Sequence, residues 1–238
     1  MLESFEVDWP ALGASAFGVR RFAHRYLGQS IEDAKAFAAD LVVIHLGLND
    51  TDPRNWPNYK DEFVNDYLKL IDAFRKVNPA CKIWICRLTP ITAKHPRFES
   101  GTRDWYWQIQ HQIEEIAGVA GVSIIDLQEG LYARPDLLPD ALHPTVEGAS
   151  IIARTVYSSL TGNFGGLKMS SLFTDGMVLQ CNEPLRITGT SNAGDQITVS
   201  VGGQKKRTVT SSNGKWSVVL DPLKAGGPYE LSVSGANK

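Results

Sequence analysis

The chain has 238 residues, of which 43% are hydrophobic and 21% charged, and its formal net charge is -2 at pH 7. This length and composition are typical of one large or two modest globular domains. The near-neutral charge argues against nucleic acid or an anionic membrane as a partner, and no apolar run approaches the ~18–20 residues of a membrane span.

The first two-thirds of the chain alternate short apolar runs with longer stretches in which apolar residues recur at helical spacing. Strands separated by amphipathic helices of this length pair in parallel through right-handed crossovers. We therefore predict an α/β fold with a three-layer open sheet. Its predicted strands cover 5–7, 41–46, 82–88 and 122–127, and they alternate with helices that begin at Ser30 and cover 63–74, 105–116 and 149–160.

The pattern changes in the last third of the chain. Residues 163–170 are rich in Gly and Ser and are predicted to be a linker. Beyond them, apolar and polar residues alternate with the strand period over 197–201, 216–220 and 229–233, and Gly-Gly and Asn-Gly pairs supply tight turns. We predict a small antiparallel β-sandwich domain over 171–238.

The strand predicted over 41–46 ends in Gly-Leu-Asn-Asp, a sequence rich in poor strand formers. In an open parallel sheet, ligands bind beyond the carboxyl ends of the strands. The side chain of Asn49 is therefore placed to donate an amide N–H to a substrate oxygen. The alternative is that Gly47 and Asn49 only turn the chain.

A second candidate stretch follows the last strand of the same α/β unit. Asp140 and His143 are three residues apart and lie directly before the predicted helix over 149–160. A carboxylate beside an imidazole accepts its Nδ1–H, fixes its tautomer and stabilises the imidazolium. The two residues are therefore candidates for a general base and its orienting acid, and the alternative is a polar surface loop.

The remaining histidines and the cysteines give no metal site. His45 lies inside a strand and is predicted to be a hydrogen-bonded core histidine, whereas His95 lies in a polar loop. No two histidines have the spacing of metal ligands, and the three cysteines form no CxxC pair. We predict no catalytic metal, no other cofactor and no disulfide framework.

Two motifs together resemble the GDSL/SGNH hydrolase family: VVIHLGLND, and DALHP about ninety residues later. The helix YKDEFVNDYLKLIDAF is also similar to that of bacterial carbohydrate esterases in this family. The resemblance covers roughly residues 3–160 and implies a flavodoxin-like α/β/α fold and ester hydrolysis by a Ser-His-Asp triad. It implies that Asn49 is an oxyanion-hole donor, that Asp140 is the orienting acid and that His143 is the general base.

The nucleophile of the family, the Ser of a Gly-Asp-Ser motif, is absent from the sequence. The stretch ALGASAF, residues 11–17, resembles the second block of the family, which makes the backbone N–H of Ala16 a second oxyanion-hole donor. We expect the sequence to be truncated at its start, with the serine upstream of Met1, and this fragment to be inactive and poorly folded. The alternative is that Ser15 is the nucleophile.

The last third resembles the leading β region of sialate O-acetylesterase-type proteins, through SLFTDGMVLQCNEPLRITGTSNAGDQITVSVGG and NGKWSVVLDPLKAGGPYELSVSG. In those proteins a second catalytic domain follows this region. The resemblance therefore implies that the sequence is also cut at its end, after Lys238. The alternative is an accessory module with no chemistry of its own.

We therefore predict a serine esterase that hydrolyses O-acetyl esters on carbohydrates of the acetylxylan or sialic-acid type. Trp56 is a candidate for stacking on a sugar ring, as are Trp105 and Trp107, and core packing is the alternative for all three. Rival functions are an esterase or lipase acting on other acyl esters, and a non-catalytic carbohydrate-binding protein. The resemblance suggests a secreted or periplasmic protein, and the sequence predicts no oligomeric state.

Overall fold

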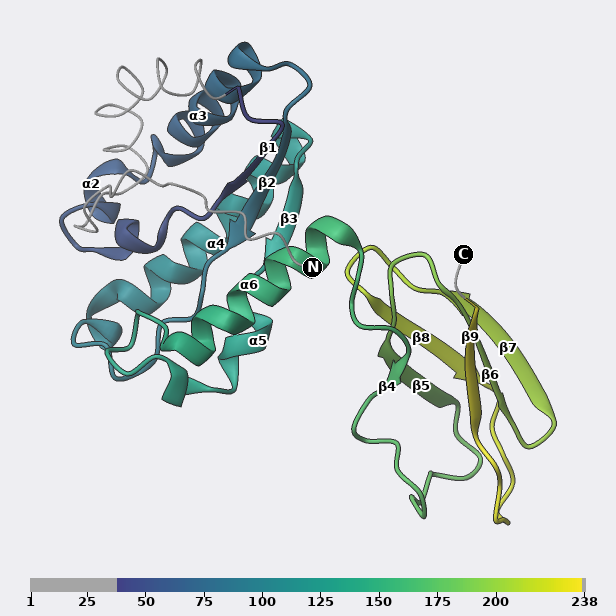
Figure 1. The fold of residues 1–238 in the computed structure, drawn as a ribbon. Coiled ribbons are helices and arrows are strands. Elements are labelled where there is room, and N and C mark those ends of the chain that lie inside the picture. The colour runs from purple at the N-terminus through teal and green to yellow at the C-terminus, as the bar shows by residue number, and fades with distance from the viewer. Residues whose placement is uncertain (1–37, 237–238) are drawn as a thin grey trace. The chain divides into compact units, whose positions relative to one another are not determined.

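The computed structural model describes residues 38–236. The chain divides into two compact units, Met1–Ile151 and Ile152–Lys238 (Figure 1). The first is an α/β unit and the second an all-β unit, and each has a hydrophobic core of its own. The strand predicted over 5–7 and the helix predicted to begin at Ser30 lie outside the described residues.

The α/β unit contains a three-stranded parallel sheet of order β1-β2-β3. This consecutive order is the one expected for the far half of a flavodoxin-like sheet, so the predicted α/β class is confirmed. Its elements are β1 (Leu41–Ile44), η1 (Leu48–Thr51), α2 (Trp56–Tyr59), α3 (Phe63–Val77), β2 (Lys82–Arg87), η2 (Phe98–Thr102), α4 (Arg103–Ala120), β3 (Ser123–Asp126), α5 (Glu129–Tyr132), η3 (Pro135–Leu137) and α6 (Val146–Thr161), the last of which crosses into the second unit.

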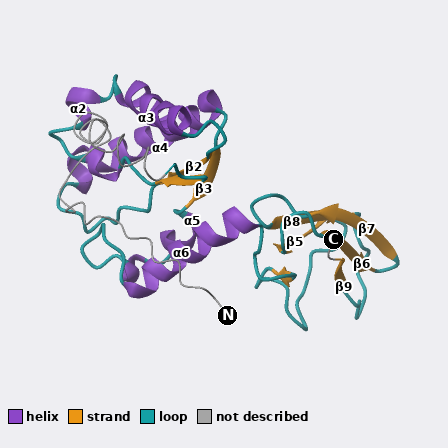
Figure 2. Cartoon of the chain, turned by 45° about the horizontal axis from the view of Figure 1, so that its top comes forward, coloured by secondary structure: helices purple, strands orange, loops and turns teal. Residues whose placement is uncertain are grey.

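The core of the α/β unit forms where α3 and α4 pack against each other and α4 packs on the sheet (Figure 2). Ile85 lies in the middle of β2 and is fully buried, as are Ile71 of α3 and Ile109 of α4. Burying an aliphatic side chain of this size contributes roughly 1.5–3 kcal/mol. The helical spacing of the apolar residues is therefore explained by the face that each helix turns toward the core.

Strand β1 differs from the prediction in two ways. It ends at Ile44, two residues before the predicted end at 46, and it is not buried on both faces, since Leu41 is 42% exposed. His45, predicted to lie in the core, is exposed. His45 follows the end of β1, at the start of the next loop, and among the described residues β1 pairs only with β2.

The all-β unit is the predicted antiparallel sandwich. One sheet has the order β4-β5-β8 and the other β7-β6-β9, and the buried side chains of both sheets form one core that includes Ile187, Val199 and Trp216. The alternation of apolar and polar residues follows directly from having one face of each strand in this core. The strands are β4 (Lys168–Met169), β5 (Leu185–Thr190), β6 (Gln196–Val201), β7 (Gln204–Val209), β8 (Lys215–Leu220) and β9 (Ser232–Ala236).

Strands β5 and β7 were not among the predicted strands, and β9 begins three residues later than the predicted strand over 229–233. Strand β7 has the sequence QKKRTV and lies at the edge of its sheet. Charged residues are common on edge strands because they discourage pairing with other chains. The hydrophobic pattern alone therefore does not identify β7.

Residues 163–170, predicted to be a linker, are hydrogen-bonded to the all-β unit. Strand β4 lies within this segment and pairs with β5. The Oδ1 atom of Asn192 accepts hydrogen bonds from the backbone N–H groups of Phe164 (2.9 Å) and Gly166 (3.2 Å). The side chain of Asn192 therefore holds the segment in place, and the predicted domain boundaries at 162 and 171 stay a prediction.

Replacing Asn192 with alanine is expected to destabilise the all-β unit by about 1–3 kcal/mol, because two backbone donors lose their acceptor. Hydrogen exchange of the amides of Phe164 and Gly166 should become faster. Asn213→Ala is the matched control, since its Oδ1 bonds only Ser211 and Lys215 in another turn. Unchanged exchange of both amides in Asn192→Ala would contradict this role.

Candidate active site

The loops after β1, β2 and β3 begin at the carboxyl edge of the sheet, because the strands are parallel. The first loop contains Asn49, and the third leads through α5 and η3 to Asp140 and His143. A hydrogen bond from the backbone N–H of Thr92 to the carbonyl of Ala141 (3.2 Å) joins the loop after β2 to the turn between Asp140 and His143. This edge is where ligands bind in open α/β sheets.

The side chains of Asp140 and His143 are in direct contact. Oδ2 of Asp140 lies 2.6 Å from Nδ1 of His143, and Oδ1 accepts hydrogen bonds from the backbone N–H groups of His143 (2.7 Å) and Leu142 (3.0 Å). The turn between them passes through Ala141, whose φ of 73° is unusual for a residue with a side chain and brings the two groups together.

The protonation states of this pair follow from the hydrogen bonds. The backbone N–H of His143, its ring and the backbone N–H of Leu142 hold the pKa of Asp140 well below its usual range. The ionised carboxylate can only accept hydrogen bonds, so the proton between the two groups belongs to Nδ1 of His143. Nε2 of the neutral ring is then unprotonated, and it is free to act as a base in an exposed side chain.

Asn49 is held by its backbone while its side chain points to solvent. Its carbonyl accepts hydrogen bonds from the side-chain amide of Asn55 (2.9 Å) and from the backbone N–H of Asp52 (3.3 Å). The residue is exposed, and its own amide makes no hydrogen bond within the described residues. The side-chain N–H groups of Asn49 are therefore available to a ligand oxygen.

The chain enters η1 through Gly47, whose φ is 122°. A side chain there would be strained, and a Cβ atom would lie 3.1 Å from Cγ2 of Ile109 and 3.4 Å from both Cδ2 of Leu88 and Cζ of Phe63. Gly47 is therefore required by the sharp turn and by the close approach of α4. This explains the first residue of the Gly-Leu-Asn-Asp sequence.

Helix α4 supports the loops after both β1 and β2. The Oε1 atom of Gln110 accepts a hydrogen bond from the backbone N–H of Leu88 (2.9 Å), and the hydroxyl of Tyr106 donates to the carbonyl of Leu88 (3.2 Å). In the other loop, Nε1 of Trp56 donates to Oε1 of Gln108 (2.8 Å). The same helix thus fixes the start of the loop after β2 and the end of the loop after β1.

Trp56 lies in the core, which is the packing alternative of the sequence analysis. It is only 2% exposed, and its ring packs edge-on against Phe63 with 5.4 Å between the ring centroids. Trp107 is 48% exposed, and Trp105 is partly buried. The indole of Trp56 therefore holds the loop after β1 and does not present a face for stacking.

Asp52 forms a charged cluster that the sequence analysis did not identify. Its carboxylate accepts hydrogen bonds from Nε (2.8 Å) and Nη2 (3.0 Å) of Arg54, and from Nη1 of Arg97 (3.0 Å). The hydrogen bonds from Arg54 are the main reason why the pKa of Asp52 lies well below its usual range. The only sequence signal was the charged stretch DTDPRNW directly after Asn49.

Two predicted site residues, Ser15 and Ala16, lie outside the described residues. Within residues 38–236, no group of three or more His, Cys, Asp or Glu side chains is arranged to hold a metal ion. In the same part of the chain, no helix has both the length and the apolar character needed to cross a membrane.

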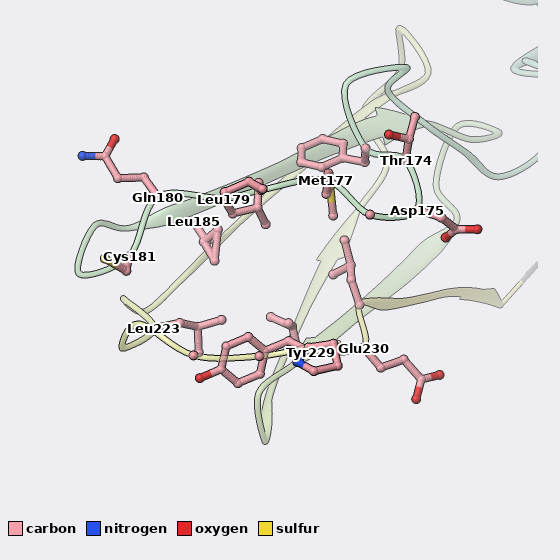
Figure 3. A pocket seen from close by; sticks show the side chains of 18 of the residues that line it. Thr174, Asp175, Met177, Leu179, Gln180, Cys181, Leu185, Leu223, Tyr229 and Glu230 are labelled. Carbon is pink, nitrogen blue, oxygen red and sulfur yellow. The ribbon is translucent and has the colours of Figure 1, made fainter.

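The all-β unit contains a separate cavity of about 680 Å³ (Figure 3). It lies between the segments 173–181 and 223–231, and Leu185 and Val201 of the sandwich core are among its lining residues. Figure 3 shows the side chains of Gln180, Asp175 and Glu230 pointing away from the centre of the cavity. Polar and apolar atoms share its lining about equally.

Comparison with known proteins identifies relatives of the α/β unit. The sequence model of the GDSL-like Lipase/Acylhydrolase family matches residues 3–151. An acetylxylan esterase from Xylanibacter ruminicola is 32% identical over 147 residues, which are 54% of this chain and 30% of that protein. The chain thus spans less than a third of the length of this curated relative.

Two solved structures are also similar. A carbohydrate acetylesterase from Xanthomonas citri is 37% identical over 29% of this chain and 16% of its own, with a TM-score of 0.28. A carbohydrate esterase family 3 protein from Talaromyces cellulolyticus is 20% identical over 61% of this chain and 67% of its own, with a TM-score of 0.49.

Proposed function

The chain belongs to the GDSL-like lipase/acylhydrolase family, and from this premise we propose that it is an esterase that releases acetyl groups from carbohydrates. The similarity to an acetylxylan esterase supports the choice of an acetylated carbohydrate as substrate. The observation that carries the proposal is the 2.6 Å contact between Oδ2 of Asp140 and Nδ1 of His143. It gives an exposed imidazole the tautomer that a general base requires.

In the proposed first half-reaction, a serine hydroxyl attacks the acetyl carbonyl carbon while Nε2 of His143 takes its proton. The nucleophile is a serine outside residues 38–236, and Ser15 is the candidate within the sequence. Collapse of the tetrahedral intermediate breaks the ester bond, and His143 returns the proton to the sugar oxygen. In the second half-reaction, water attacks the acetyl carbon while His143 takes its proton. The bond to the serine oxygen breaks, the serine oxygen receives that proton, and acetate leaves. Asp140 stabilises the imidazolium in both.

Asn49 is the proposed oxyanion donor. Its side chain lies on the loop after β1 and makes no hydrogen bond to any described residue, while its carbonyl is held by Asn55 and Asp52. A fixed backbone with an unpaired amide is the arrangement that electrostatic stabilisation of a developing oxyanion requires. The backbone N–H of Ala16 is the second proposed donor.

Replacing Asn49 with alanine is expected to lower kcat for acetyl release by about 10²–10³-fold with a small change in KM, because the donor acts mainly in the transition state. Initial rates at several substrate concentrations would measure the effects on kcat and on KM separately. Asn58→Ala is the control, since its amide bonds only the carbonyl of Arg54. Equal rates for Asn49→Ala and the unaltered protein would show that Asn49 is not an oxyanion donor.

A second candidate function is a non-catalytic carbohydrate-binding protein, which the absence of a Gly-Asp-Ser motif favours. Acetate release from acetylated xylan, O-acetylated sialic acid and long-chain acyl esters distinguishes the candidates. Release from either acetylated sugar supports the proposal, and preference for the long-chain esters would support a lipase. Binding of acetylated sugars without any release, by a protein that includes the nucleophilic serine, would support the non-catalytic function.

A further inference from the structure

The charges around Asp52 are unbalanced in favour of the two arginines. Its carboxylate is only 15% exposed and receives hydrogen bonds from both Arg54 and Arg97. Elsewhere in the unit the ratio of arginines to carboxylates is reversed, since the single Arg87 pairs with both Glu114 and Asp126. One carboxylate shared by two guanidinium groups leaves this three-residue cluster with a net positive charge.

Arg97 has donors that face no partner. Only Nη1 is used, in the 3.0 Å contact with Asp52, and its Nε and Nη2 make no hydrogen bond to a residue between 38 and 236. The side chain is 46% exposed, so these donors are accessible to a ligand. The pair with Asp52 restricts the guanidinium to one region, which prepares a planar fork for a carboxylate.

The cluster lies beside the proposed catalytic groups. Asp52 bonds the carbonyl of Asn49, and the loop that carries Arg97 is bonded through Thr92 to the turn of Asp140 and His143. His95 lies in the same loop: burial and the charge of Arg97 lower its pKa, while the charges of both Asp140 and Asp52 oppose the change. The loop 92–97 therefore links the two groups of proposed catalytic residues.

From this arrangement we infer that the site selects acetylated sugars that carry a carboxylate near the acetyl group, with Arg97 as the recognition residue. The inference rests on the proposed function and narrows its substrate class to acidic sugars, such as uronic acids. Arg97 binds the sugar carboxylate through its unused N–H groups, while Asn49 and His143 face the acetyl ester. A neutral sugar makes no equivalent contact. Lys94, exposed in the same loop, adds to the attraction.

Binding of sugar fragments tests this inference without requiring catalysis. The probes are a xylooligosaccharide that carries one glucuronate, the unsubstituted xylooligosaccharide of the same length, and sodium acetate. At low salt, NMR titration of the full chain is expected to give about 3–10-fold tighter binding of the glucuronate-bearing probe, with shifts at Arg97. This preference should shrink as salt is raised.

Arg97→Gln should abolish the preference, and Arg97→Lys should retain part of it, because lysine keeps the charge and loses the planar fork. Asp52 keeps Arg54 as a partner in both variants. Lys82→Gln is the matched control, since it removes one positive charge from the first residue of β2, at the opposite edge of the sheet. It should leave the preference unchanged.

Equal binding of both oligosaccharides, or an unchanged preference in Arg97→Gln, would overturn the inference. Binding of acetate as tight as that of the glucuronate-bearing probe would also overturn it, because Arg97 would then recognise any free carboxylate. Loss of the preference in Lys82→Gln would show long-range attraction instead of a site. Failure of the proposed function is a different result: a protein that includes the nucleophilic serine releases no acetate, whichever oligosaccharide it binds.

Discussion

Replacing His143 with alanine is expected to lower the rate of acetyl release by about 10⁴-fold or more, because the same ring removes and returns the proton in both half-reactions. The fold should persist, since the side chain is exposed. Rates with para-nitrophenyl acetate and acetylated xylan, together with the Tm of each variant, measure the two effects separately. Retained acetyl release with an unchanged fold would refute the role of His143.

The matched control is His111→Ala, which removes an exposed imidazole from α4 and should leave the rate unchanged. Asp140→Asn tests the pair itself and is expected to cost about 10⁴-fold, because an amide N–H facing Nδ1 favours the wrong tautomer. NMR offers a measurement that needs no turnover. The proton between Asp140 and His143 should give a strongly deshielded signal that disappears in Asp140→Asn.

Replacing Gly47 with alanine is expected to destabilise the α/β unit by about 2–6 kcal/mol, from backbone strain of about 1–3 kcal/mol and overpacking of similar size. The φ of 122° is unfavourable for alanine, and its Cβ would approach Ile109 to 3.1 Å. This is a large share of a typical stability of roughly 5–15 kcal/mol. Thermal unfolding followed by circular dichroism should show a Tm lower by roughly 10 °C or more.

Gly118→Ala, the same replacement at another site, is expected to raise the stability of the protein instead of lowering it. Gly118 is exposed on α4, and a Cβ there would meet no atom within 4 Å. Removing a glycine from a helix should therefore stabilise the protein by about 0.5–1 kcal/mol. If both variants lowered the Tm by the same amount, the strained turn at Gly47 would not be the cause.

The spacing of apolar residues in the sequence predicts most of the described fold. Each helix or strand with one face in the core needs apolar residues on that face, and this requirement produces the spacing. The helices that contain Ile71 and Ile109 were predicted from apolar spacing, and the strand that contains Ile85 from an apolar run. Strand β7 was missed because its charged residues suit a sheet edge and carry no apolar signal. His45 follows the end of β1 at Ile44 although the apolar run continues to Leu46, so the run does not mark where the strand ends.

Contacts within a short stretch of sequence were predictable in the candidate site, and distant contacts were not. Asp140 and His143 are three residues apart, so their chemistry suggested the contact that the structure contains. Arg97 and Asp52 are 45 residues apart, and only the adjacent loops bring them together. The same holds for Trp56, whose indole is bonded to Gln108 on another helix.

The support that α4 gives to two loops also determines how the candidate site can move. Gln110 bonds Leu88 at the start of the loop after β2, and Gln108 bonds Trp56 at the end of the loop after β1, so a shift of this helix would move both attachment points together. Trp56 and Leu88 then keep their spacing. A movement that separates Asn49 from His143 would therefore have to displace Ala141, which is buried and accepts a hydrogen bond from the backbone N–H of Thr92.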